Sequence, residues 1–411
     1  MPPGGGGGER GCTDQDHPPA PVRLAGDAPP HSMQPLPAIA PVASKQKKKQ
    51  QRPAASLPEG PLAEILARVP YKSLCRFKCV SKPWLALCSS RDILRRSPQT
   101  LSGFFYHHTD HHSGEDTLSF RNLSGSGPPQ VDPSLPFLRE SYSFIYLVQV
   151  CGGLLLCVCF SSDKGDYVVC NPATEEWTAL PPIQYPGQEF DGRLNAAIGF
   201  DAAVPSRYVV FASPTICGLD SGIVAIYSSE TGQWSYVQSQ WDSGTPVDPR
   251  GKILREKRHV FLNDTMHWPS IHKSIVTLDS EGKVWREIKM PDDLRKGTCG
   301  ISFGRSQGSL YAWKRRPRTP ELYIWVLEDY AIGKWILKHT VDVLELFRRH
   351  GRADVDSYAM FAIHPDCNVI FLTEEKMAMS YDLDNHKVDV MESMHGLPYT
   401  PCFAELSSAS H

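Results

Sequence analysis

The amino-acid sequence predicts a multidomain protein in which a disordered N-terminus and a small all-α domain of three short helices precede an all-β propeller of six blades. Three observations lead to this prediction. Residues 1–55 hold eleven prolines and seven glycines but no Phe, Tyr or Trp. Residues 56–98 repeat apolar side chains at helical spacing. Along residues 99–407, a strand–turn–strand unit recurs with a period near 50 residues.

The N-terminal 55 residues lack the apolar and aromatic side chains that would offset the entropy of ordering a backbone, so we predict a disordered tail. The tail ends in a basic run, Lys45–Arg52. Such a run fits a nuclear import signal and equally a solvated linker. The start of the chain shows no apolar segment of a secretory signal. We therefore expect localisation in the nucleus, the cytoplasm or both.

The composition argues against several classes of protein. The net charge of -2 argues against a basic nucleic-acid coat, so we expect no nucleic-acid partner. Twelve cysteines without a Cys-x-x-Cys pair favour free thiols in a reducing compartment over disulfides or structural zinc. The most apolar window, Phe144–Phe160, is interrupted by Gly152 and Gly153. It predicts two buried strands joined by a tight turn, and no membrane span.

The helical domain is predicted from its apolar spacing and its helix-end residues. One helix face is formed by residues at i, i+3, i+4 and i+7, namely Leu62, Ile65, Leu66 and Val69. Pro61 should set the start of that helix and Pro70 its end. A second short helix carries Leu74 and Phe77, and Ser81 is placed to cap a third. So small a core usually needs a partner to complete it.

The propeller is predicted from a repeated strand, a polar turn and a second strand that opens with an anchor residue. Successive anchors lie 57, 51, 50 and 53 residues apart: Trp177, Trp234, Trp285, Trp335 and Val388. Five such units predict four-stranded blades whose tryptophans pack blade against blade. Two strands within 103–139 begin a sixth blade, and the segment Thr400–Leu406 is expected to complete it and close the ring.

Residues 57–88 resemble the F-box. The matching groups are Leu57-Pro58, Glu64-Ile65-Leu66, Lys72-Ser73-Leu74, Arg76-Phe77 and Val80-Ser81-Lys82 with Trp84, whereas Pro61 and Val69 depart from the motif. The β region, best over 145–345, is similar to the F-box-associated domain of plant F-box proteins. The fragments CNPATEEWTALPP and ELYIWVLEDYAIGKWILKH are among those that carry this similarity.

The resemblance implies a non-catalytic substrate-recognition subunit of a Skp–cullin–F-box ubiquitin ligase. The F-box would dock on a Skp-type adaptor, and through it on a cullin, while the propeller would bind a protein target. The implied adaptor-binding residues are Leu57, Pro58, Leu62, Ile65, Leu66, Leu74, Val80 and Trp84. Some of them, above all Leu66 and Leu74, could instead only pack the helices together. Two other functions stay open: an adaptor-bound scaffold outside the ligase, and a carbohydrate-binding propeller lectin.

Target binding is expected on the long loops that leave one face of the propeller, because binding residues concentrate on loops held by a rigid scaffold. Arg315, Arg316 and Arg318 lie in such a loop and suit an acidic or phosphorylated motif, although solvated charges are the simpler interpretation. Trp268 and Trp313 lie outside the anchor register and are further candidates.

The sequence contains no pattern that predicts catalysis. The histidine-rich segment His107–His112 predicts a polar hairpin loop, because neighbouring side chains in a strand point to opposite faces and would not converge on a metal ion. Residues 304–308 match G-x-S-x-G, but they join two predicted strands rather than a strand and a helix, and no H-E-x-x-H or Walker-type motif occurs. We therefore expect no catalytic residue, no metal and no cofactor.

Overall fold

A computed structural model describes residues 58–109, 116–124, 129–162, 165–184, 194–201, 207–214, 223–238, 259–269, 274–295, 302–315, 319–348, 358–374, 377–392 and 395–403. The predicted disordered tail, including its basic run, lies outside these residues, and so does Leu57. Residues 110–112 of the histidine-rich segment also lie outside them. Within the described part of the chain, no helix is long and apolar enough to cross a membrane.

The helical domain contains four short helices, one more than predicted: α1 (Glu59–Leu66), α2 (Tyr71–Phe77), α3 (Lys82–Cys88) and α4 (Arg91–Arg96). The prediction missed α4 because its six residues are too few to show a period. Helix α1 begins at Glu59 rather than at Pro61, since a proline in the first turn lacks only an N–H that has no partner within the helix. The cap of α3 is confirmed, because Ser81 Oγ accepts a hydrogen bond from Trp84 N at 3.4 Å.

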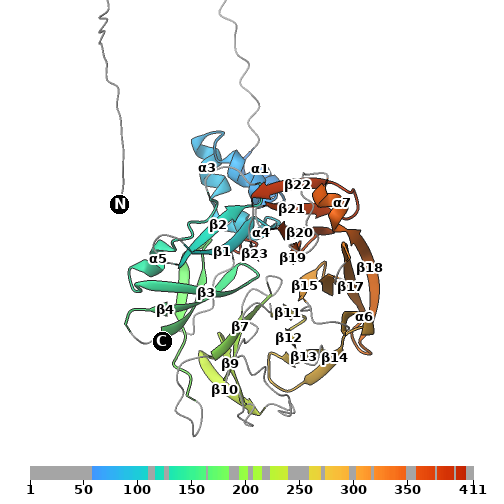
Figure 1. The fold of residues 1–411 in the computed structure, drawn as a ribbon. Helices are drawn as coiled ribbons and strands as arrows, with labels where there is room; N and C mark the ends of the chain where they lie inside the picture. The colour runs from blue at the N-terminus through green and yellow to red at the C-terminus, as the bar shows by residue number, and fades with distance from the viewer. Residues whose placement is uncertain are drawn as a thin grey trace, which may run out of the picture. The chain divides into compact units, whose positions relative to one another are not determined.

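Five four-stranded antiparallel sheets form blades 1 to 5, each with its strands in chain order (Figure 1). Blade 1 holds β3 (Phe144–Cys151), β4 (Leu154–Phe160), β5 (Gly165–Asn171) and β6 (Glu176–Ala179). Blade 2 holds β7 (Leu194–Phe200), β8 (Tyr208–Pro214), β9 (Ile223–Ser228) and β10 (Gln233–Gln238). Blade 3 holds β11 (Val260–Leu262), β12 (Thr265–Pro269), β13 (Ser274–Asp279) and β14 (Trp285–Lys289).

Blade 4 holds β15 (Ser302–Ser306), β16 (Ser309–Arg315), β17 (Glu321–Asp329) and β18 (Lys334–Asp342). Blade 5 holds β19 (Ala359–Ile363), β20 (Val369–Glu374), β21 (Met377–Asp382) and β22 (Val388–Glu392). The first strands of neighbouring blades contact one another, so they surround the axis and the fourth strands form the rim. Short helices α5 (Pro136–Arg139), α6 (Asp292–Arg295) and α7 (Val343–Arg348) lie between sheets in the sequence.

The sixth blade joins the two ends of the propeller, as predicted. Its described strands are β2 (Asp116–Asn122), β1 (Gly103–Thr109) and β23 (Leu397–Tyr399), in that order. The closing strand lies three residues earlier than the predicted segment Thr400–Leu406, of which residues 404–406 lie outside the described part.

The anchor tryptophans pack blade against blade, as predicted. Trp234 Nε1 donates to Pro181 O at 2.8 Å, and Trp335 Nε1 donates to Lys289 O at 3.2 Å. In both cases the acceptor lies four residues after the anchor of the preceding blade, whereas Trp285 Nε1 has no hydrogen-bond partner among the described residues. The polar turns before the anchors are also structural. Asp279 and Asp382, for example, accept hydrogen bonds from backbone N–H groups of their own turns.

Two histidines of the propeller have strongly lowered pKa values: His267 is fully buried and His259 is half-buried. Burial lowers the pKa of both His259 and His267 to about 4. His267 Nδ1 lies 3.0 Å from Val260 O, which only accepts, so Nδ1 carries the proton. Its Nε2 therefore accepts a hydrogen bond from the Tyr330 hydroxyl at 2.8 Å. His107, from the histidine-rich segment, instead stacks on Tyr146 at 4.7 Å, and no metal-binding group occurs among the described residues.

We expect the propeller to lose stability as the pH falls below about 6.5, the ordinary pKa of histidine in an unfolded chain. Because the folded-state pKa values of His259 and His267 are lowered, the unfolded chain binds more protons between pH 6.5 and about 4. Each histidine would cost about 2 kcal/mol on going from pH 7 to pH 5. Thermal unfolding at both pH values measures this loss. His267→Gln should show a smaller loss than the wild type, and an equal loss would contradict the prediction.

Candidate functional site

The helical domain has a small core that uses some of the predicted adaptor-binding residues. The side chains that fill this core are Leu66, Leu74, Cys88, Ile93, Leu94 and Phe403. Leu66 is 1% exposed and Leu74 is fully buried, so both pack the helices together. A partner could contact these two side chains only if the helices separated. Leu66 and Leu74 are therefore core residues and not part of the adaptor surface.

The remaining predicted residues lie nearer to solvent. Ile65 is 51% exposed and Val80 is 60% exposed, Pro58 is also exposed, and Leu62 and Trp84 are half-buried. Leu85 of α3 is 47% exposed and was missed by sequence reasoning, although its position beside Trp84 could have indicated it. We define the adaptor surface as the exposed apolar side chains Ile65, Val80 and Leu85, together with Pro58. Isolated exposed apolar residues are common, so these side chains are candidates for the partner contact that the F-box resemblance implies.

The helical domain is also positively charged. Residues 58–98 contain eight Lys and Arg side chains but three Asp and Glu, a difference of +5. Two of the three carboxylates are already paired with one cation, because Arg96 lies 2.7 Å from Glu64 and 3.6 Å from Asp92. The Arg96 guanidinium lowers the pKa of the Glu64 carboxyl. The domain therefore favours an acidic partner surface, with an attraction that salt would screen.

The helical domain packs against the propeller through the segment that follows β23. The rings of Tyr71 and Phe403 are 4.9 Å apart, and Ala173, in the turn between β5 and β6, packs against the same core. Asn171 Nδ2 donates to Cys402 O at 2.9 Å and is itself fully buried. One short segment thus joins the helical domain to blade 1.

The contact with Ala173 places the helical domain at the short-turn face of the propeller. We use this name for the face that carries the turns between strands one and two and between strands three and four of each blade. The other connections leave the opposite face, which holds most of the long loops. These loops, 185–193, 239–258, 296–301, 316–318 and 349–357, lie outside the described residues.

The predicted target-binding residues lie in different environments. Trp313 is 4% exposed and donates from Nε1 to Met360 O at 3.0 Å, so it is a core residue and not a contact for a target. Trp268 is half-buried against Phe211, with ring centroids 5.4 Å apart. Arg315 lies over the ring of Tyr358 at 5.4 Å. Arg316 and Arg318 lie outside the described residues, so the arginine cluster stays a prediction.

A small helical domain with an exposed apolar surface, joined to a six-bladed propeller, defines the class of F-box proteins with an F-box-associated propeller. Comparison with known proteins agrees: residues 55–96 match the F-box domain, and residues 127–409 match the family described as F-box protein At3g26010-like, beta-propeller. The chain belongs to this family. The second match covers well over half of its length.

Several F-box proteins of Arabidopsis thaliana are similar to most of the chain. F-box protein At5g49610 is 26% identical over 84% of this chain and 94% of its own length. F-box protein At5g07610 is 27% identical over 78% of this chain and 79% of its own. Putative F-box protein At1g47765 is 32% identical over 90% of this chain and 95% of its own.

Proposed function

We propose that the protein is a substrate-recognition subunit of a Skp–cullin–F-box ubiquitin ligase. The adaptor surface of the helical domain would bind a Skp-type adaptor and through it a cullin, and the propeller would bind the protein target. The observation that carries the proposal is that some apolar residues of the F-box fill its core while others are exposed to solvent. Leu66 and Leu74 fill its core, while Ile65, Val80 and Leu85 remain available to a partner.

The position of the F-box supports separate binding sites for the adaptor and for the target. The helical domain packs on the short-turn face beside Ala173, whereas the loops predicted to bind a target connect strands at the opposite face. An adaptor and a target could therefore bind together. The protein itself would catalyse nothing, and ubiquitin transfer would belong to other subunits. We propose that it acts in the nucleus, the cytoplasm or both, which a fluorescent fusion with and without residues 45–52 would test.

Co-purification from cells tests the proposed function. We expect the tagged full-length chain to recover both a Skp-type adaptor and a cullin, because the F-box binds the adaptor and the adaptor bridges to the cullin. Recovery of the adaptor without the cullin would contradict the ligase and favour a scaffold. Glycan binding without recovery of the adaptor would instead favour a lectin. Exposure to high salt should weaken recovery, since the F-box is positively charged.

A further inference from the structure

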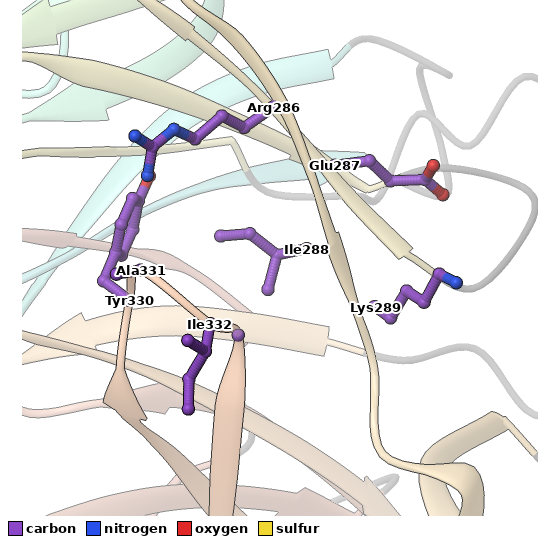
Figure 2. A pocket seen from close by; sticks show the side chains of 8 residues that line it. Arg286, Glu287, Ile288, Lys289, Tyr330, Ala331 and Ile332 are labelled. Carbon is purple, nitrogen blue, oxygen red and sulfur yellow. The ribbon is translucent and has the colours of Figure 1, made fainter.

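A pocket of about 420 Å³ opens on the rim of the propeller, between blades 3 and 4. It lies between β14, the outer strand of blade 3, and the turn that precedes β18 in blade 4 (Figure 2). We call it the rim pocket; its lining residues are Arg286–Lys289 and Tyr330–Gly333. Its volume is within the usual range for ligand sites.

The rim pocket combines an apolar surface with an uncompensated cation. Figure 2 shows the side chains of Arg286 and Ile288 directed toward Tyr330, and that of Glu287 directed away from it, as the alternation of a strand requires. Ile288 is buried, whereas Ile332 is 75% exposed at the end of the turn, more than any other large apolar side chain of the described residues. Neither Arg286 nor Lys289 forms an ion pair within the described part of the chain.

Hydrogen bonds hold the walls of the rim pocket in place. Asp329 Oδ1 accepts from Ala331 N at 2.9 Å and from Ile332 N at 3.3 Å, which fixes the turn that presents Ile332. The Tyr330 hydroxyl donates to the buried His267, as described above. Trp335 Nε1 donates to Lys289 O and joins the turn to β14. A pocket formed before binding avoids the entropic cost of ordering its walls.

The residues of the rim pocket depart from the repeat. Three residues before the anchor, the other blades carry Thr174, Thr231, Gly282 and Asn385, where blade 4 carries Ile332. One residue after the anchor, the other blades carry Thr178, Ser235, Ile336 and Asp389, where blade 3 carries Arg286. The fold therefore needs neither residue, and an exposed isoleucine in a polar turn has no packing role. Such local departures are expected at binding sites.

We propose that the rim pocket binds a short extended peptide of the target protein that carries an apolar side chain next to a carboxylate. The apolar side chain would pack between Ile288 and Ile332, and the carboxylate would pair with Arg286. Among the described strands β14 pairs only with β13, so the part of its outer edge before Lys289, whose carbonyl accepts from Trp335, can also bond the peptide backbone. The inference rests on the proposed function for the origin of the peptide, but the binding needs neither adaptor nor cullin.

A peptide array tests the proposal with the full-length chain. The probes are peptides of about seven residues in which Leu, Ile, Val or Phe is flanked by Asp or Glu, a length suited to a strand edge. Two matched arrays replace the acids by their amides or the apolar residue by Ser. We expect binding, measured by fluorescence polarisation, to favour the acidic and apolar array over both others. The best peptides should bind Ile332→Thr and Arg286→Glu about tenfold more weakly than the wild type.

The variants are chosen so that folding is not in question. Ile332→Thr introduces the residue that two other blades carry at this position, and Arg286 is exposed. Ser235→Glu, in the same register of blade 2, and Val390→Thr, an exposed apolar residue of blade 5, should bind the peptides like the wild type. Arg286→Glu should also bind peptides in which Lys replaces the acid better than the wild type does.

Two results would overturn the rim-pocket proposal: equal binding to all three arrays, or unchanged binding by both Ile332→Thr and Arg286→Glu. Recovery of the adaptor by the same variants is measured in parallel. A failed array with intact adaptor recovery would reject the pocket and leave the proposed function standing. Peptide binding without adaptor recovery would reject the ligase and leave the pocket standing.

Discussion

The double variant Ile65→Asp, Val80→Asp should lose adaptor binding while keeping its fold. Both side chains are more than half exposed, and surface substitutions usually change stability by less than about 0.5 kcal/mol. Burying each side chain in an interface would contribute about 1.5–3 kcal/mol. Losing both should weaken adaptor binding by about two to four orders of magnitude. Pull-down with purified adaptor and thermal unfolding of the same sample measure the two effects.

Two further variants make this test specific. Val390→Asp places the same charge on an exposed apolar residue of blade 5 and should leave adaptor binding unchanged. Leu66→Ala opens the core of the helical domain and should destabilise it by about 2–5 kcal/mol, so its loss of binding would accompany unfolding. The adaptor surface is wrongly assigned if the double aspartate variant still binds with wild-type affinity. Leu57→Ala with Pro58→Ala, the pair indicated by the motif, extends the test to the start of the domain.

Removing residues Leu397–His411 should prevent the propeller from folding cooperatively. The deletion removes β23, exposes one edge of β1 and leaves Phe105 and Phe120 without Tyr399, whose ring lies 5.2 Å and 5.9 Å from theirs. An exposed strand edge promotes aggregation. Removing only Thr400–His411 retains β23 and should mainly loosen the helical domain. Size-exclusion chromatography and thermal unfolding distinguish these outcomes, and a monomeric propeller without β23 would contradict the assignment.

Point substitutions at Tyr399 test how much the closing strand stabilises the propeller, without the other effects of truncating the chain. Tyr399 is fully buried, so Tyr399→Ala should destabilise the propeller by about 3–5 kcal/mol, a large fraction of the 5–15 kcal/mol typical of a domain. Its hydroxyl has no hydrogen-bond partner among the residues that the structure describes. Tyr399→Phe should therefore be neutral or slightly stabilising, because it removes an unsatisfied polar group. Equal melting temperatures for the two variants would show that the ring does not hold the blade closed.

Sequence patterns predicted the parts of the fold that repeat. The anchor tryptophans located the outer strands because a similar contact with the preceding blade recurs at this position, as Trp234 and Trp335 show. Very short elements cannot be recognised from a pattern in the sequence. Helix α4 has six residues and β23 has three, so neither shows a pattern of its own. Their positions depend on tertiary contacts, such as those that hold Tyr399 among the phenylalanines.

The candidate sites were predicted less completely than the fold. The F-box motif identified Ile65 and Val80 but could not separate them from Leu66 and Leu74, because one helical stripe supplies both the core and the adaptor surface. Trp313 lies outside the anchor register, yet it is a core residue. The rim pocket joins residues from two blades, so no local motif contains it. The repeat alone could have indicated it, since Ile332 stands where the other units carry Thr, Gly or Asn.

The packing of Phe403 on Tyr71 has a consequence for the synthesis of the protein. The F-box leaves the ribosome first, but the residues that seat it on the propeller, Cys402 and Phe403, are made after every blade. Until then the helices contact the propeller at blade 1, through Ala173, but lack the packing of Phe403 on Tyr71. We therefore expect a chain that ends before Cys402 to hold its helical domain less firmly on the propeller than the full-length chain does.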